Sequence, residues 1–329
     1  MSLRAYHERD IVDLRTKRIT GGRIRTFELT ERKVGEIQTI VIGFHGIACP
    51  DTSEHTFFQH LWAAFQLQNN ITNQRIHTAC SLTFAPYVRG NNRNHASLDS
   101  EINVFPDTIN RITHIIRNRY KKEEPLKILL VGHSWGALQL LKAPLDQVPK
   151  QTTVEAWLLN PYLELHPQVP LVELLENGLL SIGRSIEWAL PLAAKLAAEP
   201  IITQLLNEAI GSATRDEYQR IMHEADTATT LALLANMFNS AHKHTIPLES
   251  EYHWDAIKGI FLGGAEKLVD NKATAALLQR LPKHMRPPII TLSGTHMLPR
   301  DQEACTCMAG IIMNPEPYLR GEVINFNNK

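Results

Sequence analysis

The pentapeptide GHSWG at 132–136 limits the possible folds of this chain more than any other feature of its sequence. The apolar run 128–131 before it predicts a β-strand, and a helical pattern follows it. A serine with glycines two positions before and two after fits a very tight turn between a strand and a helix, which exposes the Ser134 hydroxyl as a candidate nucleophile. A chain with 17 glycines and 12 serines gives only about 0.03 chance matches to this pattern. The alternative is an ordinary glycine-containing turn without a chemical role.

Short β-type runs alternate with longer helical patterns along much of the chain. The run 39–44 is apolar almost throughout, as expected for a strand that is covered on both faces. This alternation predicts parallel strands joined by crossover helices, and hence an α/β fold with a doubly wound, mostly parallel sheet. The predicted strands are 39–44, 82–85, 128–131, 154–159, 257–262 and 289–292, and the clearest helical patterns cover 58–65, 98–116 and 275–281.

The segment 162–248 interrupts the alternation because it carries no strand pattern. It is rich in leucine and alanine, and the stretch TRDE at 214–217 has the pattern of a helix capping box. We therefore predict an all-helical insertion at 162–248, with 1–161 and 249–329 together forming the sheet domain. A length of 329 residues, 43% of them hydrophobic, is sufficient for a core of that size.

Charge and hydropathy argue against several classes of function. The 34 basic residues balance the 34 acidic ones, so no net charge attracts the chain to nucleic acid or to anionic membranes. The longest apolar stretch, 188–198, is broken by Pro191 and Lys195 and is too short for a transmembrane helix. The N-terminal residues are polar and lack the apolar run of a secretory signal, so we expect a cytoplasmic protein. The four cysteines match neither a disulfide framework nor a zinc motif, and we expect no metal site.

An HGI tripeptide follows the first predicted strand and is a candidate for binding an oxyanion. Acyl transfer by a serine passes through a tetrahedral oxyanion, which backbone N–H groups stabilise. We expect one N–H from Trp135, directly after the serine, and one from Ile47, because Gly46 allows the backbone to approach closely. His45 and His133, which adjoin these positions in sequence, are expected to contact the substrate. By itself, the His-Gly pair would be interpreted as a turn that ends a strand.

The base that a nucleophilic serine requires is predicted to be His296, one of 15 histidines. His296 lies in the loop 293–297, directly after the last predicted strand. His253 and His284 each precede a predicted strand, so neither lies at the carboxyl end of one. The alternative is that His296 is a surface or structural histidine.

The acid that would orient this histidine is predicted in the loop after the strand 257–262. Two carboxylates lie there, and we favour Glu266, four residues past the strand, over Asp270. The simpler interpretation of either residue is a solvated charge or a helix N-cap, and it suits Asp270 better because a helical pattern follows. After the strand 154–159 the corresponding position is Asn160, which is not an acid.

Together these motifs resemble the α/β-hydrolase superfamily, in which nucleophile, acid and histidine follow one another in this order. The resemblance includes the HGI loop, the GHSWG turn, the Gly-x-His loop and an acid loop with Glu266 where aspartate is commoner. The segment 85–92 looks like the family's loop ending in Arg-Gly, with Tyr87 in place of its usual aspartate. The resemblance implies a sheet of about eight strands and a helical cap, or lid, at 162–248. Pro144 is expected to shorten the helix after the serine.

By this resemblance the chain would be a serine hydrolase that cleaves a carboxylic ester or thioester of a small or acyl-chain molecule through a covalent acyl-enzyme. Ser134, His296 and Glu266 would form the catalytic triad, and no metal or organic cofactor would be required. Large apolar residues of the predicted cap could line an acyl pocket, although most are expected to pack the cap itself. One alternative is an aminopeptidase or amidase of the same fold; another is a hydrolase-like binding protein without turnover. The filled triad positions favour an enzyme.

Overall fold

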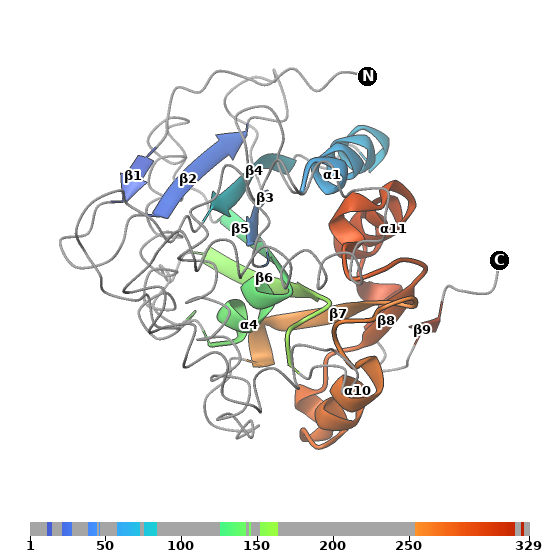
Figure 1. Cartoon of the computed structure of the whole chain (residues 1–329). Coiled ribbons are helices and arrows are strands. Elements are labelled where there is room, and N and C mark those ends of the chain that lie inside the picture. Colours follow the sequence, from blue (N-terminus) through green and yellow to red (C-terminus); the bar gives the residue numbers. More distant parts are fainter. Residues whose placement is uncertain are drawn as a thin grey trace, which may run out of the picture.

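One sheet of nine strands runs through the part of the chain that the structure, a computed structural model, describes. Its strands are β1 (Val12–Leu14), β2 (Gly22–Phe27), β3 (Thr39–Phe44), β4 (Ile76–Thr83), β5 (Leu126–His133), β6 (Thr152–Leu159), β7 (Ile257–Gly263), β8 (Ile289–Leu292) and β9 (Ile324–Asn325). They lie in the order β1-β2-β4-β3-β5-β6-β7-β8-β9 (Figure 1). The β1–β2 and β2–β4 pairs are antiparallel, and the other pairs are parallel. The described residues are 12–14, 22–27, 39–44, 46, 58–72, 76–83, 126–142, 145, 152–163, 254–319 and 324–325.

The predicted α/β fold with a mostly parallel sheet is confirmed. Five of the predicted strands fall within β3, β5, β6, β7 and β8, and the sixth, 82–85, overlaps the end of β4, which begins at Ile76. Three strands were not predicted: β1 and β9 have three and two residues, and β2 has the sequence GRIRTF. These strands lack the continuous apolar run that marks a strand buried on both faces, which is why the sequence pattern does not reveal them.

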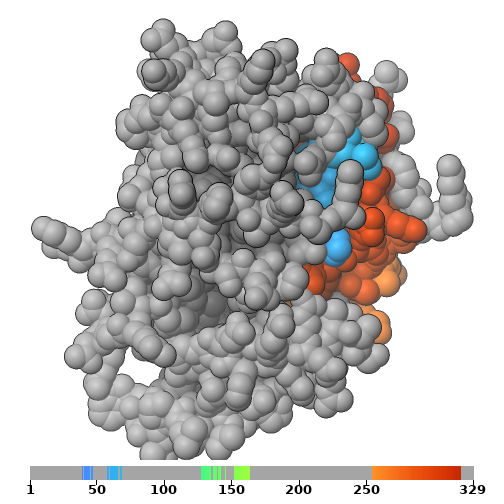
Figure 2. Space-filling view, turned by 90° about the horizontal axis from the view of Figure 1, so that it is seen from above, coloured from blue at the N-terminus to red at the C-terminus, as the bar shows by residue number. Residues whose placement is uncertain are grey.

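Helices cover both faces of the sheet. The helices α1 (Gln59–Thr72) and α11 (Gln302–Met313) pack against each other, and Figures 1 and 2 show their segments side by side. They share one hydrophobic cluster with Leu129 and Val131 of β5. Neighbouring residues of a strand point to opposite faces, so Gly132 faces the other way. There a Cβ on Gly132 would lie 2.7 Å from the Cα of Ala137, which places the helix α4 (Trp135–Lys142) on that second face.

Large apolar side chains along one side of α1 explain why this segment forms a buried helix. Phe58, Leu61, Trp62 and Phe65 recur at helical spacing in the predicted helical segment 58–65, and all are at most 1% exposed. Phe58 and Trp62 stack with ring centroids 5.2 Å apart, and a Cβ on Gly43 of β3 would lie 2.7 Å from the Phe58 ring. The aromatic side chains therefore occupy the space that a glycine leaves open on the strand.

The helix after the serine turn is short, as Pro144 predicts. It has eight residues and ends at Lys142, because a proline disfavours helical backbone at the residue before it and cannot donate its own hydrogen bond. The predicted helical pattern at 275–281 corresponds to α10 (Asn271–Gln279), whereas α11 was not predicted.

Several predicted elements lie outside the described residues. They include the helical stripe 98–116, the capping box 214–217 and, apart from Tyr162 and Leu163, the predicted cap 162–248. The domain boundaries at 161 and 249 therefore stay a prediction. Among the residues that are described, no helix is both long and apolar enough to cross a bilayer.

Candidate active site

Ser134 occupies a tight, buried turn between β5 and α4. Its backbone has a φ of +52°, a left-handed conformation that non-glycine residues rarely adopt and that often marks a functional position. The Ser134 N–H donates to the Leu159 carbonyl at 2.9 Å, while its own carbonyl accepts the N–H groups of Ala137 and Leu138 at 3.1 and 3.2 Å. The end of β6 and the first turn of α4 therefore hold the serine backbone in this conformation.

Two glycines allow the backbone to approach this turn closely. A Cβ on Gly132 would lie 2.7 Å from Ala137 Cα, so only glycine permits the tight junction of strand and helix. A Cβ on Gly46 would lie 3.0 Å from the Cβ of Ser134 and 2.9 Å from His133 Nδ1. The loop after β3 thus reaches the serine turn, as the sequence predicts. Ile47 and His45 lie outside the described residues.

Trp135, the other predicted oxyanion donor, is the first residue of α4. The N–H groups in the first turn of a helix have no partner within the helix, and they lie at the positive end of its dipole. The position of Trp135 is therefore suitable for stabilising a developing negative charge next to Ser134.

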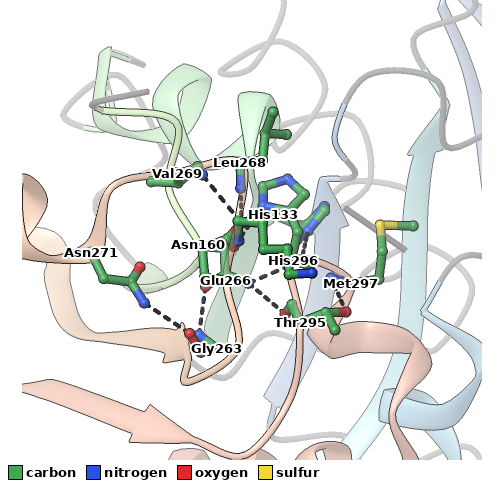
Figure 3. Close-up of polar contacts among 11 residues, drawn as sticks. His133, Asn160, Gly263, Glu266, Leu268, Val269, Asn271, Thr295, His296 and Met297 are labelled. Carbon is green, nitrogen blue, oxygen red and sulfur yellow. Dashed lines mark hydrogen bonds and ion pairs between the residues drawn. The ribbon is translucent and has the colours of Figure 1, made fainter. Parts of the chain in front are cut away.

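His296 and Glu266 form a buried pair. The Nδ1 atom of His296 lies 2.8 Å from Oε2 of Glu266, and these side chains are 5% and 1% exposed (Figure 3). The loops that carry them follow β8 and β7, whose carboxyl ends are adjacent because the two strands are parallel neighbours. Since the carboxylate accepts a hydrogen bond from Nδ1–H, the proton of the neutral imidazole stays on Nδ1, and Nε2 is free of hydrogen and able to act as a base.

The second oxygen of Glu266 is bound by backbone. Its Oε1 atom accepts the N–H groups of Lys267, Leu268 and Val269 at 2.9, 2.7 and 3.2 Å. Burial alone raises the pKa of this carboxyl, but the positive charge and the hydrogen bond of His296, together with the backbone N–H groups, outweigh burial and hold the pKa below its usual value. Glu266 therefore stays a carboxylate at neutral pH.

Asp270 has a different partner set. It is the N-cap of α10, and its Oδ1 atom accepts the N–H groups of Lys272 and Ala273, each at 2.9 Å. An N-cap carboxylate of this kind satisfies helix N–H groups that would otherwise lack a partner. Of the two predicted acids, the structure thus brings Glu266 to His296 and places Asp270 at the start of a helix.

His133 points toward the loop 293–297, which carries His296 and is called the histidine loop below. Its ring is 1% exposed, and its Nε2 atom donates to the backbone carbonyl of His296 at 2.7 Å. The rings of His133 and His296 lie 4.9 Å apart between centroids, at an angle of 56° (Figure 3). The predicted contact of His133 with substrate stays a prediction, while its ring has a definite structural partner.

Asn160 is a residue of the site that the sequence analysis missed. It follows β6, is fully buried and has a φ of +40°. Its Nδ2 atom donates to the carbonyls of Thr295 and His296 at 3.1 and 2.9 Å, and its Oδ1 atom accepts the Gly263 N–H at 2.7 Å. The available signal was an asparagine directly after a buried parallel strand, since such strand ends meet at the edge of the sheet where ligands bind.

These residues share one edge of the sheet. Gly46, Ser134, Asn160, Glu266 and His296 follow β3, β5, β6, β7 and β8, which are consecutive parallel strands. A serine on a strained turn, at the sheet edge that also carries a buried histidine–carboxylate pair, is the set of groups needed for nucleophilic attack with general-base assistance. Within the described part of the chain, no three histidine, cysteine or acidic side chains form a group that could hold a metal ion.

Comparisons with known proteins identify the family of this chain and its fold. The model of the family described as serine aminopeptidase, S33, matches residues 90–303. DcsB in complex with its substrate analogue is 13% identical with a TM-score of 0.53, covering 91% of this chain and 94% of its own. The epoxide hydrolase CorEH is 11% identical with a TM-score of 0.51, covering 91% and 97%.

A soluble variant of the monoglyceride lipase of Saccharomyces cerevisiae, in complex with a substrate analogue, has a TM-score of 0.50 to this chain. It is 9% identical, and the match covers 91% of either chain. At these identities the structural matches establish a common fold. No curated protein sequence is significantly similar to this chain.

Proposed function

Because the chain belongs to the α/β-hydrolase superfamily, we propose that it is a serine hydrolase that cleaves a carboxylic ester or thioester. The observation that carries this proposal is the buried 2.8 Å pair of His296 and Glu266 at the sheet edge where Ser134 occupies its strained turn. A histidine whose Nδ1 is held by a carboxylate has its Nε2 available to take a proton from a serine.

The proposed reaction uses Ser134 as the nucleophile. His296 takes the hydroxyl proton while the Ser134 oxygen bonds to the substrate carbonyl carbon, and Glu266 stabilises the imidazolium that forms. The N–H groups of Ile47 and Trp135 would bind the oxyanion. His296 then gives its proton to the departing alcohol or thiol, and it activates a water that hydrolyses the acyl-enzyme. No step requires a metal or an organic cofactor.

A second candidate, peptide or amide hydrolysis, is favoured by the description of the matching family as a serine aminopeptidase. The same residues would act, and the difference would lie in the amine leaving group and in the recognition of a substrate ammonium. Carboxylates in the predicted cap are the candidates for that recognition: Glu173, Glu176 and Glu187, which lie outside the described residues. Comparing p-nitrophenyl esters with aminoacyl p-nitroanilides separates the two activities.

An activated serine should react with a fluorophosphonate probe. We expect the purified chain to be labelled covalently at one site, and we expect the labelling to disappear in Ser134→Ala, because phosphonylation uses the same nucleophile and base as acyl transfer. Gel fluorescence and peptide mass spectrometry provide the measurement. A native protein that stays unlabelled would indicate a hydrolase-like binding protein, and labelling that persists in Ser134→Ala would place the nucleophile elsewhere.

The acyl chain length is a further part of the proposal. The leucine-rich segment 162–248 suggests an apolar pocket, so kcat/KM should rise from acetate to medium or long p-nitrophenyl esters as more apolar surface is buried. Initial rates across a series of chain lengths test this expectation, with enzyme-free hydrolysis subtracted for each ester. A sharp preference for acetate would contradict it.

A further inference from the structure

The backbone carbonyl of His296 accepts hydrogen bonds from two buried side chains. His133 Nε2 approaches it at 2.7 Å and Asn160 Nδ2 at 2.9 Å (Figure 3). The Asn160 amide also donates to the carbonyl of Thr295 at 3.1 Å. Both donors are at most 1% exposed, so water does not replace them readily.

The hydrogen-bond partners determine which atom of each side chain is the donor. Asn160 Oδ1 accepts the Gly263 N–H at 2.7 Å, so the Nδ2 atom must face the histidine loop, where the atoms within reach are carbonyl oxygens. A carbonyl oxygen can only accept, so the His133 Nε2 atom carries a hydrogen. The two side chains thus present two N–H groups to one oxygen.

Both donors are also neighbours of the serine. His133 directly precedes Ser134, and Asn160 directly follows Leu159, whose carbonyl accepts the Ser134 N–H at 2.9 Å. The same two residues therefore connect the serine turn to the loop of His296 by short, buried bonds. A shift of that loop relative to the serine would have to break one of them.

We propose that His133 and Asn160 are positioning residues that hold the His296 carbonyl and thereby place the His296 imidazole for proton transfer with Ser134. We call the pair the carbonyl clamp. Glu266 holds the ring at Nδ1, whereas the clamp holds the backbone from which the ring projects. The clamp rests on the proposed function, because it assigns His296 the role of base.

Asn160→Asp tests the first donor. Aspartate has the same shape, accepts the Gly263 N–H and tolerates a positive φ, but its carboxylate cannot donate to Thr295 or His296. We expect kcat to fall by about 10²-fold, since a displacement of about 1 Å between reacting groups has an effect of this size. KM should stay within about threefold of the native value, because both polar atoms of the buried Asn160 side chain bind protein backbone.

His133 provides an independent pair of variants. His133→Phe keeps an aromatic ring against His296 and loses the donor, whereas His133→Gln retains an N–H near the position of Nε2. We expect His133→Phe to lower kcat by about 10²-fold and His133→Gln to recover at least about tenfold of that loss. The double variant with Asn160→Asp should be non-additive, because both bonds end on one oxygen.

The matched control is Asn271→Asp. The Asn271 amide also donates to a backbone carbonyl, that of Gly263, at 2.8 Å, but it has no bond to the histidine loop. Its kcat should stay within about twofold of the native value. Its melting temperature should fall, but less than that of Asn160→Asp, because the partly buried Asn271 loses one donated hydrogen bond and Asn160 loses two.

A spectroscopic readout separates positioning from general stability. The His296 Nδ1 proton, which is donated in a hydrogen bond to Glu266, should give a downfield proton NMR signal that is absent in His296→Gln. In folded Asn160→Asp or His133→Phe we expect this signal to shift or broaden.

Native kcat and an unchanged signal in both variants would overturn the clamp. If Asn160→Asp does not fold, the kcat values and NMR signals of His133→Phe and His133→Gln decide whether the clamp proposal stands. If the native chain neither turns over esters nor reacts with the fluorophosphonate, the proposed function fails, and the NMR signal alone decides whether the clamp exists.

Discussion

Ser134→Ala and His296→Ala are each expected to lower kcat by on the order of 10⁴-fold or more, with a modest change in KM. The first variant removes the nucleophile and the second removes the base, and neither group is needed to bind the ground state of the substrate. The measurement is steady-state hydrolysis of a p-nitrophenyl ester by purified protein, with circular dichroism to verify folding. Because the two residues act as one unit, the double variant should be no slower than either single variant within about a factor of three.

Ser293→Ala is the matched control for this pair. Ser293 is exposed and lies in the same loop as His296, so the same chemical change is made three residues from the base. Its kcat should equal that of the native chain. Activity that survives in Ser134→Ala, or a loss in Ser293→Ala that matches it, would contradict the assignment of the nucleophile.

Glu266→Gln is expected to lower kcat by on the order of 10³-fold, less than the loss in Ser134→Ala. The neutral amide leaves the imidazolium without its partner charge, and its N–H group can turn toward Nδ1 and select the wrong tautomer of His296. The loss should appear mainly in kcat, because Glu266 is 1% exposed on its side chain and offers almost no surface to substrate.

Asp270→Asn is the control for the acid. Asparagine is as good an N-cap as aspartate, so both the stability of α10 and the activity should stay close to native. Steady-state kinetics of Glu266→Gln and Asp270→Asn, measured side by side, decide which of the two carboxylates orients His296. If Asp270→Asn is the more damaging change, the acid is Asp270 and the geometry of the Glu266–His296 pair has another purpose.

Local sequence patterns were sufficient to predict the central part of this site. The apolar run before Ser134, the two glycines around it and the helical pattern after it all lie within 17 residues of one another, from 126 to 142, so they specify β5, the turn and α4 together. The strands that were missed lie toward the two edges of the sheet: β1 and β2, with its sequence GRIRTF, on the antiparallel side, and β9 at the opposite edge beside β8. Their pairing depends on neighbours that are distant in the chain, and their own residues carry little apolar signal.

Of the contacts made by Glu266 and Asp270, only the local ones could be predicted from sequence. The helical pattern after Asp270 correctly indicated an N-cap, because capping is a contact between residues two and three positions apart. That Glu266 meets His296, 30 residues away, depends on β7 and β8 being parallel neighbours whose carboxyl ends coincide.

The sequence by itself determined the α/β class, the strained turn at Ser134 and the two loops from which a base and an acid could come, because each depends on backbone conformation and apolar spacing over a few residues. Only the tertiary structure decided which side chains meet there. The hydrogen bonds from His133 and Asn160 to the His296 carbonyl join residues 163 and 136 positions apart. No local sequence pattern around His133 or Asn160 indicates that partner. The order of the strands brings them together, and that order is set by packing across the whole sheet.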